Sequence, residues 1–155
     1  MVGKLKSEIK QQRGFESLEE EATLNVARTA EFMMNAVAEV LKPFSLTVTQ
    51  YNALRILRGA SGNGLMCGEI GERMVTKESD ITRLLDRLET RGLISRERPA
   101  ENRRIVIATI TETGLNLLAD LDRPVADCNK RLSAGLGKAE LKTLVSMLEA
   151  IRETE

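Results

Sequence analysis

The stretch Glu78-Ser-Asp-Ile-Thr-Arg-Leu-Leu-Asp-Arg-Leu-Glu-Thr-Arg-Gly-Leu-Ile-Ser-Arg96 contains the clearest helix signal in the chain together with the residues that end it. Apolar side chains recur at i, i+3, i+4 and i+7, at Ile81, Leu84, Leu85 and Leu88, which places them on one helix face. Gly92 follows where a helix commonly ends on a left-handed residue. The stretch therefore predicts a helix over about 78–91 with an opposite, polar face.

The spacing of apolar residues changes directly after this helix. Residues 93–98 and 103–110 are typical of two strands, and the turn-forming run Pro99 to Asn102 separates them, so we expect a β-hairpin. Thr111 is placed to cap a further helix that runs to about Leu132 and is bent or interrupted at Pro124. A last helix is predicted over about 138–152.

Helices are also predicted upstream of the quoted stretch. After a polar, frayed arm over residues 1 to about 15, a long helix runs from near Ser17 to near Leu41. A second helix starts at Thr47, which has capping-box spacing with Gln50, and ends at Gly59. A short helix over about 67–74 and a turn then precede the 78–91 helix. This order predicts a mainly α (α+β) winged helix-turn-helix with a two-stranded wing.

The first and last helices carry more apolar residues than so small a winged part can cover. We expect them to pack against their copies in a second subunit, which makes the protein a homodimer. A chain of 155 residues with 42% hydrophobic residues suits one domain, 1–155. Within it, about 45–110 would form the DNA-binding part, and about 16–42 and 111–153 the dimerisation helices.

Charge and cysteine usage narrow the class of protein further. The formal net charge is zero, but Arg96, Arg98, Arg103 and Arg104 form a local basic segment, which favours a local anion contact over a generally adhesive surface. The sequence has no apolar run long enough to span a membrane, so no membrane partner is expected. Cysteines that form no CxxC pair indicate a cytoplasmic protein rather than a disulfide framework.

The polar face of the 78–91 helix carries side chains that suit DNA. Arg83 and Arg87 project one turn apart, and a guanidinium can pair with the two acceptors of a guanine edge. Ser79 and Thr82 lie near the start of the helix, where hydroxyl groups suit phosphate or base contacts. Asp80 either accepts a hydrogen bond from a cytosine amino group or caps the helix.

Alternating charges at this spacing are by themselves typical of a solvated helix face. Their position after a short helix and before an arginine-rich hairpin favours DNA contact instead. Near the tip of the predicted wing, Arg103 and Arg104 suit a narrow, electronegative minor groove.

The quoted stretch resembles the recognition helix and first wing strand of MarR-type regulators. Asn102-Arg-Arg-Ile-Val-Ile-Ala-Thr-Ile-Thr-Glu-Thr-Gly114 resembles the second wing strand of that family and the start of its next helix. The family's wing usually reads Asp-x-Arg, in which the aspartate steadies the arginine, whereas this chain has Asn102 and Arg104 at those positions. The expected DNA-binding residues are Lys77, Ser79, Asp80, Thr82, Arg83, Arg87, Arg98, Asn102, Arg103 and Arg104.

The resemblance also implies a small effector, aromatic or phenolic, bound between the dimer helices and the DNA-reading part. Candidate lining residues are Phe32, Met33, Tyr51, Arg55 and Met66, although such residues are more often plain core. Cys67 is a candidate thiol sensor, and the alternative for it is a small buried apolar residue.

Catalysis is not expected, because the chain contains no histidine and no nucleophile motif, and we expect neither a cofactor nor a metal. Two functions remain. The first is a sequence-specific DNA-binding regulator, a ligand-responsive repressor that binds palindromic operators as a homodimer. The alternative is a winged-helix protein–protein adaptor that uses the same face without binding DNA.

Overall fold

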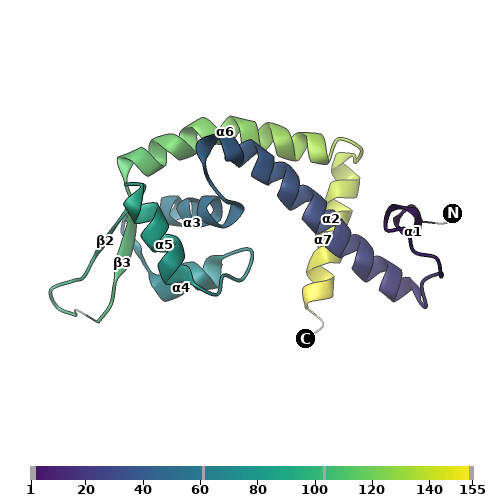
Figure 1. The fold of residues 1–155 in the computed structure, drawn as a ribbon, viewed down its shortest axis with the longest axis horizontal. Helices are drawn as coiled ribbons and strands as arrows, with labels where there is room; N and C mark the ends of the chain where they lie inside the picture. The colour runs from purple at the N-terminus through teal and green to yellow at the C-terminus, as the bar shows by residue number, and fades with distance from the viewer. Residues whose placement is uncertain (1–2, 61, 103, 154–155) are drawn as a thin grey trace. The chain divides into compact units, whose positions relative to one another are not determined.

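The computed structural model describes residues 3–60, 62–102 and 104–153 (Figure 1). The chain divides into two compact units, Met1–Ala36 and Val37–Glu155. In the first unit, a short helix α1 (Leu5–Glu8) precedes helix α2 (Leu18–Leu41), which continues into the second unit. Ser17 begins α2, since its hydroxyl accepts a hydrogen bond from the Glu20 N–H. The expectation of a frayed arm is wrong at α1, where local hydrogen bonds close a helical turn and Leu5 is buried.

The second unit has the element order of a winged helix-turn-helix. After α2 follow η1 (Lys42–Phe44), α3 (Val48–Gly59), β1 (Leu65–Met66), α4 (Cys67–Arg73), α5 (Ile81–Thr90), β2 (Ile94–Glu97), β3 (Ile107–Ile110), α6 (Glu112–Leu132) and α7 (Lys138–Arg152). The predicted capping box of α3 is present, because Thr47 and Gln50 each accept a hydrogen bond from the other residue's backbone N–H. The mainly α fold class is confirmed.

One hydrophobic core holds the helix-turn-helix of this unit together. Helices α3, α4, α5 and α6 each contribute fully buried side chains, namely Leu54, Leu57, Ile70, Leu85, Leu88, Leu118 and Leu121. The apolar face predicted for the quoted stretch is the face that α5 buries, and its polar face is therefore left toward solvent. This packing presents the side chains that sequence reasoning assigned to DNA.

Helix α5 ends as the glycine at its C-terminus predicts. Gly92 has φ +68° and its N–H donates to the Glu89 carbonyl at 2.8 Å, while the Leu93 N–H donates to the Leu88 carbonyl at 3.0 Å. These two bonds define a Schellman motif, in which the left-handed residue costs little only when it is glycine. The chain therefore reverses sharply from α5 into β2.

Strands β2 and β3 form the predicted hairpin, which extends beyond the helices α3, α4 and α5 (Figure 1). Their pairing is antiparallel, with Ser95 opposite Thr109, but both strands are shorter than predicted, and β3 begins at Ile107. A further strand, β1, pairs with β3 and makes the order β1-β3-β2. The wing thus belongs to a three-stranded sheet, which an alternation rule cannot detect because β1 is too short to show a period.

Helix α6 follows the wing without a linker. Thr111 caps it as predicted, accepting from the Gly114 N–H at 3.1 Å, and also donates its hydroxyl proton to the Gly92 carbonyl at 2.7 Å. The helix is continuous across Pro124, so of the two expected alternatives the interruption is wrong and the bend stays a prediction. Buried side chains on both sides of the proline, Leu121 and Val125, keep the helix on the core although one backbone bond is missing.

An ion pair joins α3 to α6. The guanidinium of Arg58 donates to both carboxylate oxygens of Asp122, at 2.9 Å each. These hydrogen bonds lower the pKa of Asp122 and raise that of Arg58. A bidentate arginine–carboxylate pair also fixes the relative orientation of the two groups, so it holds α3 against α6 at one point.

Candidate nucleic-acid interface

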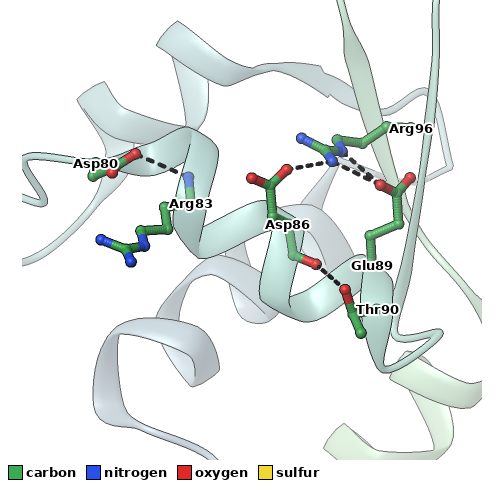
Figure 2. A network of polar contacts seen from close by, with 6 residues as sticks. All are labelled: Asp80, Arg83, Asp86, Glu89, Thr90 and Arg96. Carbon is green, nitrogen blue, oxygen red and sulfur yellow. Dashed lines mark hydrogen bonds and ion pairs between the residues drawn. The ribbon is translucent and has the colours of Figure 1, made fainter.

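The exposed face of α5 carries Thr82, Arg83 and Arg87, as the sequence predicts. The main-chain N–H of Arg83 donates to Asp80, whereas its guanidinium makes no contact with the other labelled residues (Figure 2). Within residues 3–60, 62–102 and 104–153, neither Arg83 nor Arg87 is paired with a carboxylate at ion-pair distance. Both guanidinium groups therefore have donors available for an external acceptor.

Asp80 is the N-cap of α5. Its Oδ1 accepts a hydrogen bond from the Arg83 N–H at 2.9 Å, so the structure shows the capping role, one of the two that the sequence left open. The helix starts at Ile81, three positions later than predicted, because Asp80 caps it and the N-cap is the last residue before the helix. Ser79 consequently lies before the helix and not on its face. Ser79 and Lys77 are both exposed in this segment.

A cleft of about 360 Å³ separates the start of α5 from the start of α3. Residues from both elements line it, and it brings together four of the predicted contact residues. Its lining comprises Thr47, Thr49, Gln50, Glu78, Ser79, Asp80, Arg83, Leu84 and Arg87. The hydroxyl groups of Thr47 and Thr49, which sequence reasoning did not assign, thus lie beside the same cleft as the two arginines; the capping signal at Thr47 was their only indication.

The wing is tied to α5 by Arg96, which sequence reasoning counted only as part of the basic segment. From β2, its Nη2 donates to Asp86 Oδ1 at 2.5 Å and to Glu89 Oε2 at 2.7 Å (Figure 2). These contacts, with Glu89 the stronger, raise the pKa of Arg96 above its usual value. The i, i+3 spacing of Asp86 and Glu89 just before the hairpin was the signal for this role, and Arg96 is structural.

The wing tip exposes Arg98, Asn102 and Arg104, and Arg103 lies outside the described residues. The side-chain oxygen of Asn102 accepts from the backbone N–H of Arg104 at 3.1 Å. The family's usual aspartate steadies the wing arginine, whereas the Asn102 side chain binds the main chain here, as asparagine commonly does in turns. A second cleft of about 400 Å³, lined by Thr82, Arg98 and four other residues, lies between α5 and the wing.

The predicted effector residues fall into both units of the chain. Tyr51 is buried on α3, and the guanidinium of Arg55 lies over its ring at 5.8 Å from the centroid. Met66 is exposed in β1. Phe32 and Met33 are exposed on the part of α2 that belongs to the first unit. Their assignment to an effector site stays a prediction.

Cys67 begins α4 and is half-buried, and Cys128 is buried on α6. A thiol-sensing role for Cys67 stays a prediction. Among the residues that the structure describes, no group of histidine, cysteine and carboxylate side chains is arranged to hold a metal ion. In the same residues, no helix combines the length and the apolar character needed to span a membrane.

Comparison with known proteins agrees with this geometry. A family model described as "MarR family" matches residues 46–106, which include α3, α4, α5 and the first wing strand. A crystal structure of a MarR transcription factor from Planctomyces limnophilus is 41% identical, with a TM-score of 0.69 over 88% of this chain and 99% of that one. The chain belongs to the MarR family.

Two further solved structures that resemble this MarR-family chain contain a bound ligand or DNA. CouR from Rhodococcus jostii RHA1, bound to p-coumaroyl-CoA, is 25% identical with a TM-score of 0.74, over 91% of this chain and 98% of that one. A mutant MarR from E. coli, complexed with operator DNA, is 22% identical with a TM-score of 0.77, over 88% of this chain and 99% of that one. The latter likeness establishes the shared fold.

Proposed function

We propose that this MarR-family protein is a sequence-specific DNA-binding transcriptional regulator, a ligand-responsive repressor that binds palindromic operators as a homodimer. The observation that carries the proposal is the exposed face of α5, where Arg83 and Arg87 have no carboxylate partner within the described residues and a wing projects alongside. Two exposed arginines that line one cleft beside a wing suit contacts with a nucleic acid.

The proposed contacts divide into two kinds. Helix α5 enters the major groove, where Arg83 and Arg87 read base edges, while Lys77, Ser79 and Thr82 bind the backbone nearby. Asp80 contributes by starting the helix. The wing residues Arg98, Asn102, Arg103 and Arg104 would lie at the minor groove.

The homodimer is supported by apolar side chains left exposed on α7. Val145, Met147 and Ile151 are 53, 61 and 60% exposed, which is unusual for so many large apolar groups on one helix. We propose that about 16–42 and 111–153 form the dimerisation region and about 45–110 the DNA-binding part.

A charge on α7 tests this dimer. In Met147→Glu, a carboxylate would have to be buried in the interface, so we expect a monomer at micromolar concentration by analytical ultracentrifugation. Glu149→Gln, at an exposed position on the same helix, should leave the dimer intact. A monomeric unaltered protein would refute the dimer.

The proposal of a small-molecule effector rests on the similarity of this chain to CouR. CouR binds p-coumaroyl-CoA, and we propose that this chain also responds to a small aromatic or phenolic compound. Tyr51 and Arg55 are the favoured contacts, because an aromatic ring beside a cation suits an aromatic acid. Phe32, Met33 and Met66 remain candidate lining residues.

Selection of bound duplexes from a random DNA library, at one stated moderate salt concentration, tests the function directly. We expect an inverted repeat whose half-site centres are about 10 base pairs apart. Because the phosphate contribution depends strongly on salt, the selection is repeated at a lower salt concentration. Recovery of no sequence above background at either concentration would favour the protein–protein adaptor.

A further inference from the structure

The connection between α2 and α3 contains an unusual backbone conformation. After the turn η1, Ser45 has φ +53° and ψ +38°, a left-handed conformation that residues other than glycine rarely adopt. Its N–H donates to the Lys42 carbonyl at 2.9 Å, and the next residue, Leu46, is buried. A residue other than glycine keeps such a conformation only when its surroundings favour it.

Arg91, which is distant from this turn in the sequence, supplies contacts to it. It is the C-cap residue of α5, and its Nη1 donates to the Ser45 carbonyl at 2.7 Å and its Nη2 to the Phe44 carbonyl at 3.0 Å. The two carbonyls are 46 and 47 residues away from Arg91 in the chain. The planar guanidinium presents its donors as a rigid fork, so binding both oxygens fixes direction as well as distance.

Both partners of this contact are attached to the core within a few residues. On one side, Leu41 and Leu46 flank the turn and are 0 and 5% exposed. On the other side, Leu88 and Leu93 flank Arg91 and are 0 and 3% exposed. Neither side can move far without disturbing packed side chains, so the two hydrogen bonds fix the end of α5 relative to the end of α2.

We propose that Arg91 is a positioning residue that sets the location of the recognition helix relative to the end of α2, and thereby the half-site spacing that the dimer accepts. This inference rests on the proposed function. In a dimer that reads two half-sites, the separation of the recognition helices must match the separation of the sites. A contact that fixes α5 against the end of a dimerisation helix therefore controls which spacing fits.

A direct contact between Arg91 and a DNA phosphate is the competing role, because Arg83, Arg87 and Arg91 follow one another at intervals of one helical turn. The two roles differ in their salt dependence. Loss of a phosphate contact reduces the slope of log affinity against log salt by about one, whereas loss of a positioning contact leaves the slope unchanged.

The test uses the full-length protein and the operator obtained by selection, together with duplexes that have one base pair added or removed at the centre. For the unaltered protein we expect about tenfold weaker binding to the altered spacings, and for Arg91→Ala less than about threefold discrimination with an unchanged salt slope. Arg91→Lys should fall between them, because one ammonium group cannot reproduce the fork. Arg13→Ala, which removes an exposed arginine outside the proposed DNA-binding and dimerisation parts, is the matched control.

Amide hydrogen exchange provides a readout that is independent of DNA. In Arg91→Ala, the Ser45 and Leu46 amides should exchange faster, while the Leu121 amide in the core of α6 should not change. Retained spacing preference in Arg91→Ala, with or without a reduced salt slope, would overturn the inference. If the unaltered protein binds no duplex, the proposed function fails and this inference fails with it. Binding by the unaltered protein with an unchanged Arg91→Ala variant overturns this inference alone.

Discussion

Arg96 donates to a single oxygen of Glu89 from two of its nitrogens, Nε at 3.0 Å and Nη2 at 2.7 Å. Arg96 lies in wing strand β2 and Glu89 in recognition helix α5, so one guanidinium joins the two elements that are proposed to contact DNA. The arginine side chain is only 19% exposed, and Asp86 satisfies it from the other side. The orientation of the wing is thus set from within the protein before any ligand binds.

Replacement of Arg96 by alanine should weaken DNA binding more than it weakens the fold. The wing would lose its fixed orientation, so we expect affinity for the selected operator to fall about tenfold by fluorescence anisotropy. Because both carboxylates are partly exposed, the free energy of unfolding should fall by only about 1 kcal/mol in urea titrations. Unchanged affinity in Arg96→Ala, with the exposed Arg13→Ala as the control, would show that the wing does not need this link.

Arg83→Ala and Arg104→Ala should change different properties of DNA binding. Loss of Arg83 removes a proposed base contact, so discrimination at one operator position should fall by about 1–3 kcal/mol, whereas loss of Arg104 should weaken all sequences about equally. Competition binding against single-base operator variants measures both effects. The assignments would be wrong if Arg104→Ala changed the base preference while Arg83→Ala preserved it.

Gly114→Ala should destabilise the protein. A Cβ at this buried position would collide with the Leu93 carbonyl oxygen and approach Ile110, and both belong to the junction of the wing with α6. We expect a loss of about 1–3 kcal/mol in the free energy of unfolding. Gly59→Ala is the matched control, because its Cβ would meet no atom within 4 Å. Equal stability of the two variants would contradict the close approach.

The pair of Arg58 and Asp122 should make stability depend on pH in the acid range. Hydrogen bonding by Arg58 lowers the pKa of Asp122 below its usual 3.8, so the stabilisation is present above that value and is lost as pH falls through the folded-state pKa. Since Asp122 is half exposed, the effect should stay below about 1 kcal/mol.

Urea unfolding between neutral pH and pH 2.5 or so, followed for the unaltered protein and for Arg58→Gln, Asp122→Asn and the double variant, measures this dependence. The coupling energy from the double-mutant cycle should vanish at the acid end. A coupling that persists after Asp122 is protonated would mean that the pair acts through packing and not through charge.

Local rules predicted the parts of the molecule that neighbouring residues determine. The apolar face of α5, its end at Gly92 and the capping of α6 by Thr111 each depend on residues within a few positions. The start of α5 was predicted too early because Asp80 fits both a helix face and a cap, and only the bond to the Arg83 N–H decides between them.

Features that depend on distant partners were not predictable in this way. Strand β1 exists because β3 pairs with it, and Arg96 acquires its role from carboxylates on another element. The side-chain oxygen of Asn102 accepts from the backbone N–H of Arg104. The sequence alone does not show whether this oxygen binds a backbone donor or a side-chain donor. The exposed residues of the candidate DNA face were predicted more completely than the contacts that hold this face in place. Helix periodicity shows which side chains are exposed, whereas those contacts depend on how distant elements pack.

Met66 ends strand β1 and immediately precedes the first residue of α4, where its N–H donates to Glu69 at 2.9 Å. There is no linker between the sheet and the helix-turn-helix at this point. One inserted residue would move Leu65 and Met66 to opposite faces or displace the start of α4. The residues between Glu97 and Ile107 join two strands of the same sheet, so a change of length there displaces no helix. During divergence, insertions and deletions should therefore accumulate in the hairpin, while the length of the chain around Met66 stays constant.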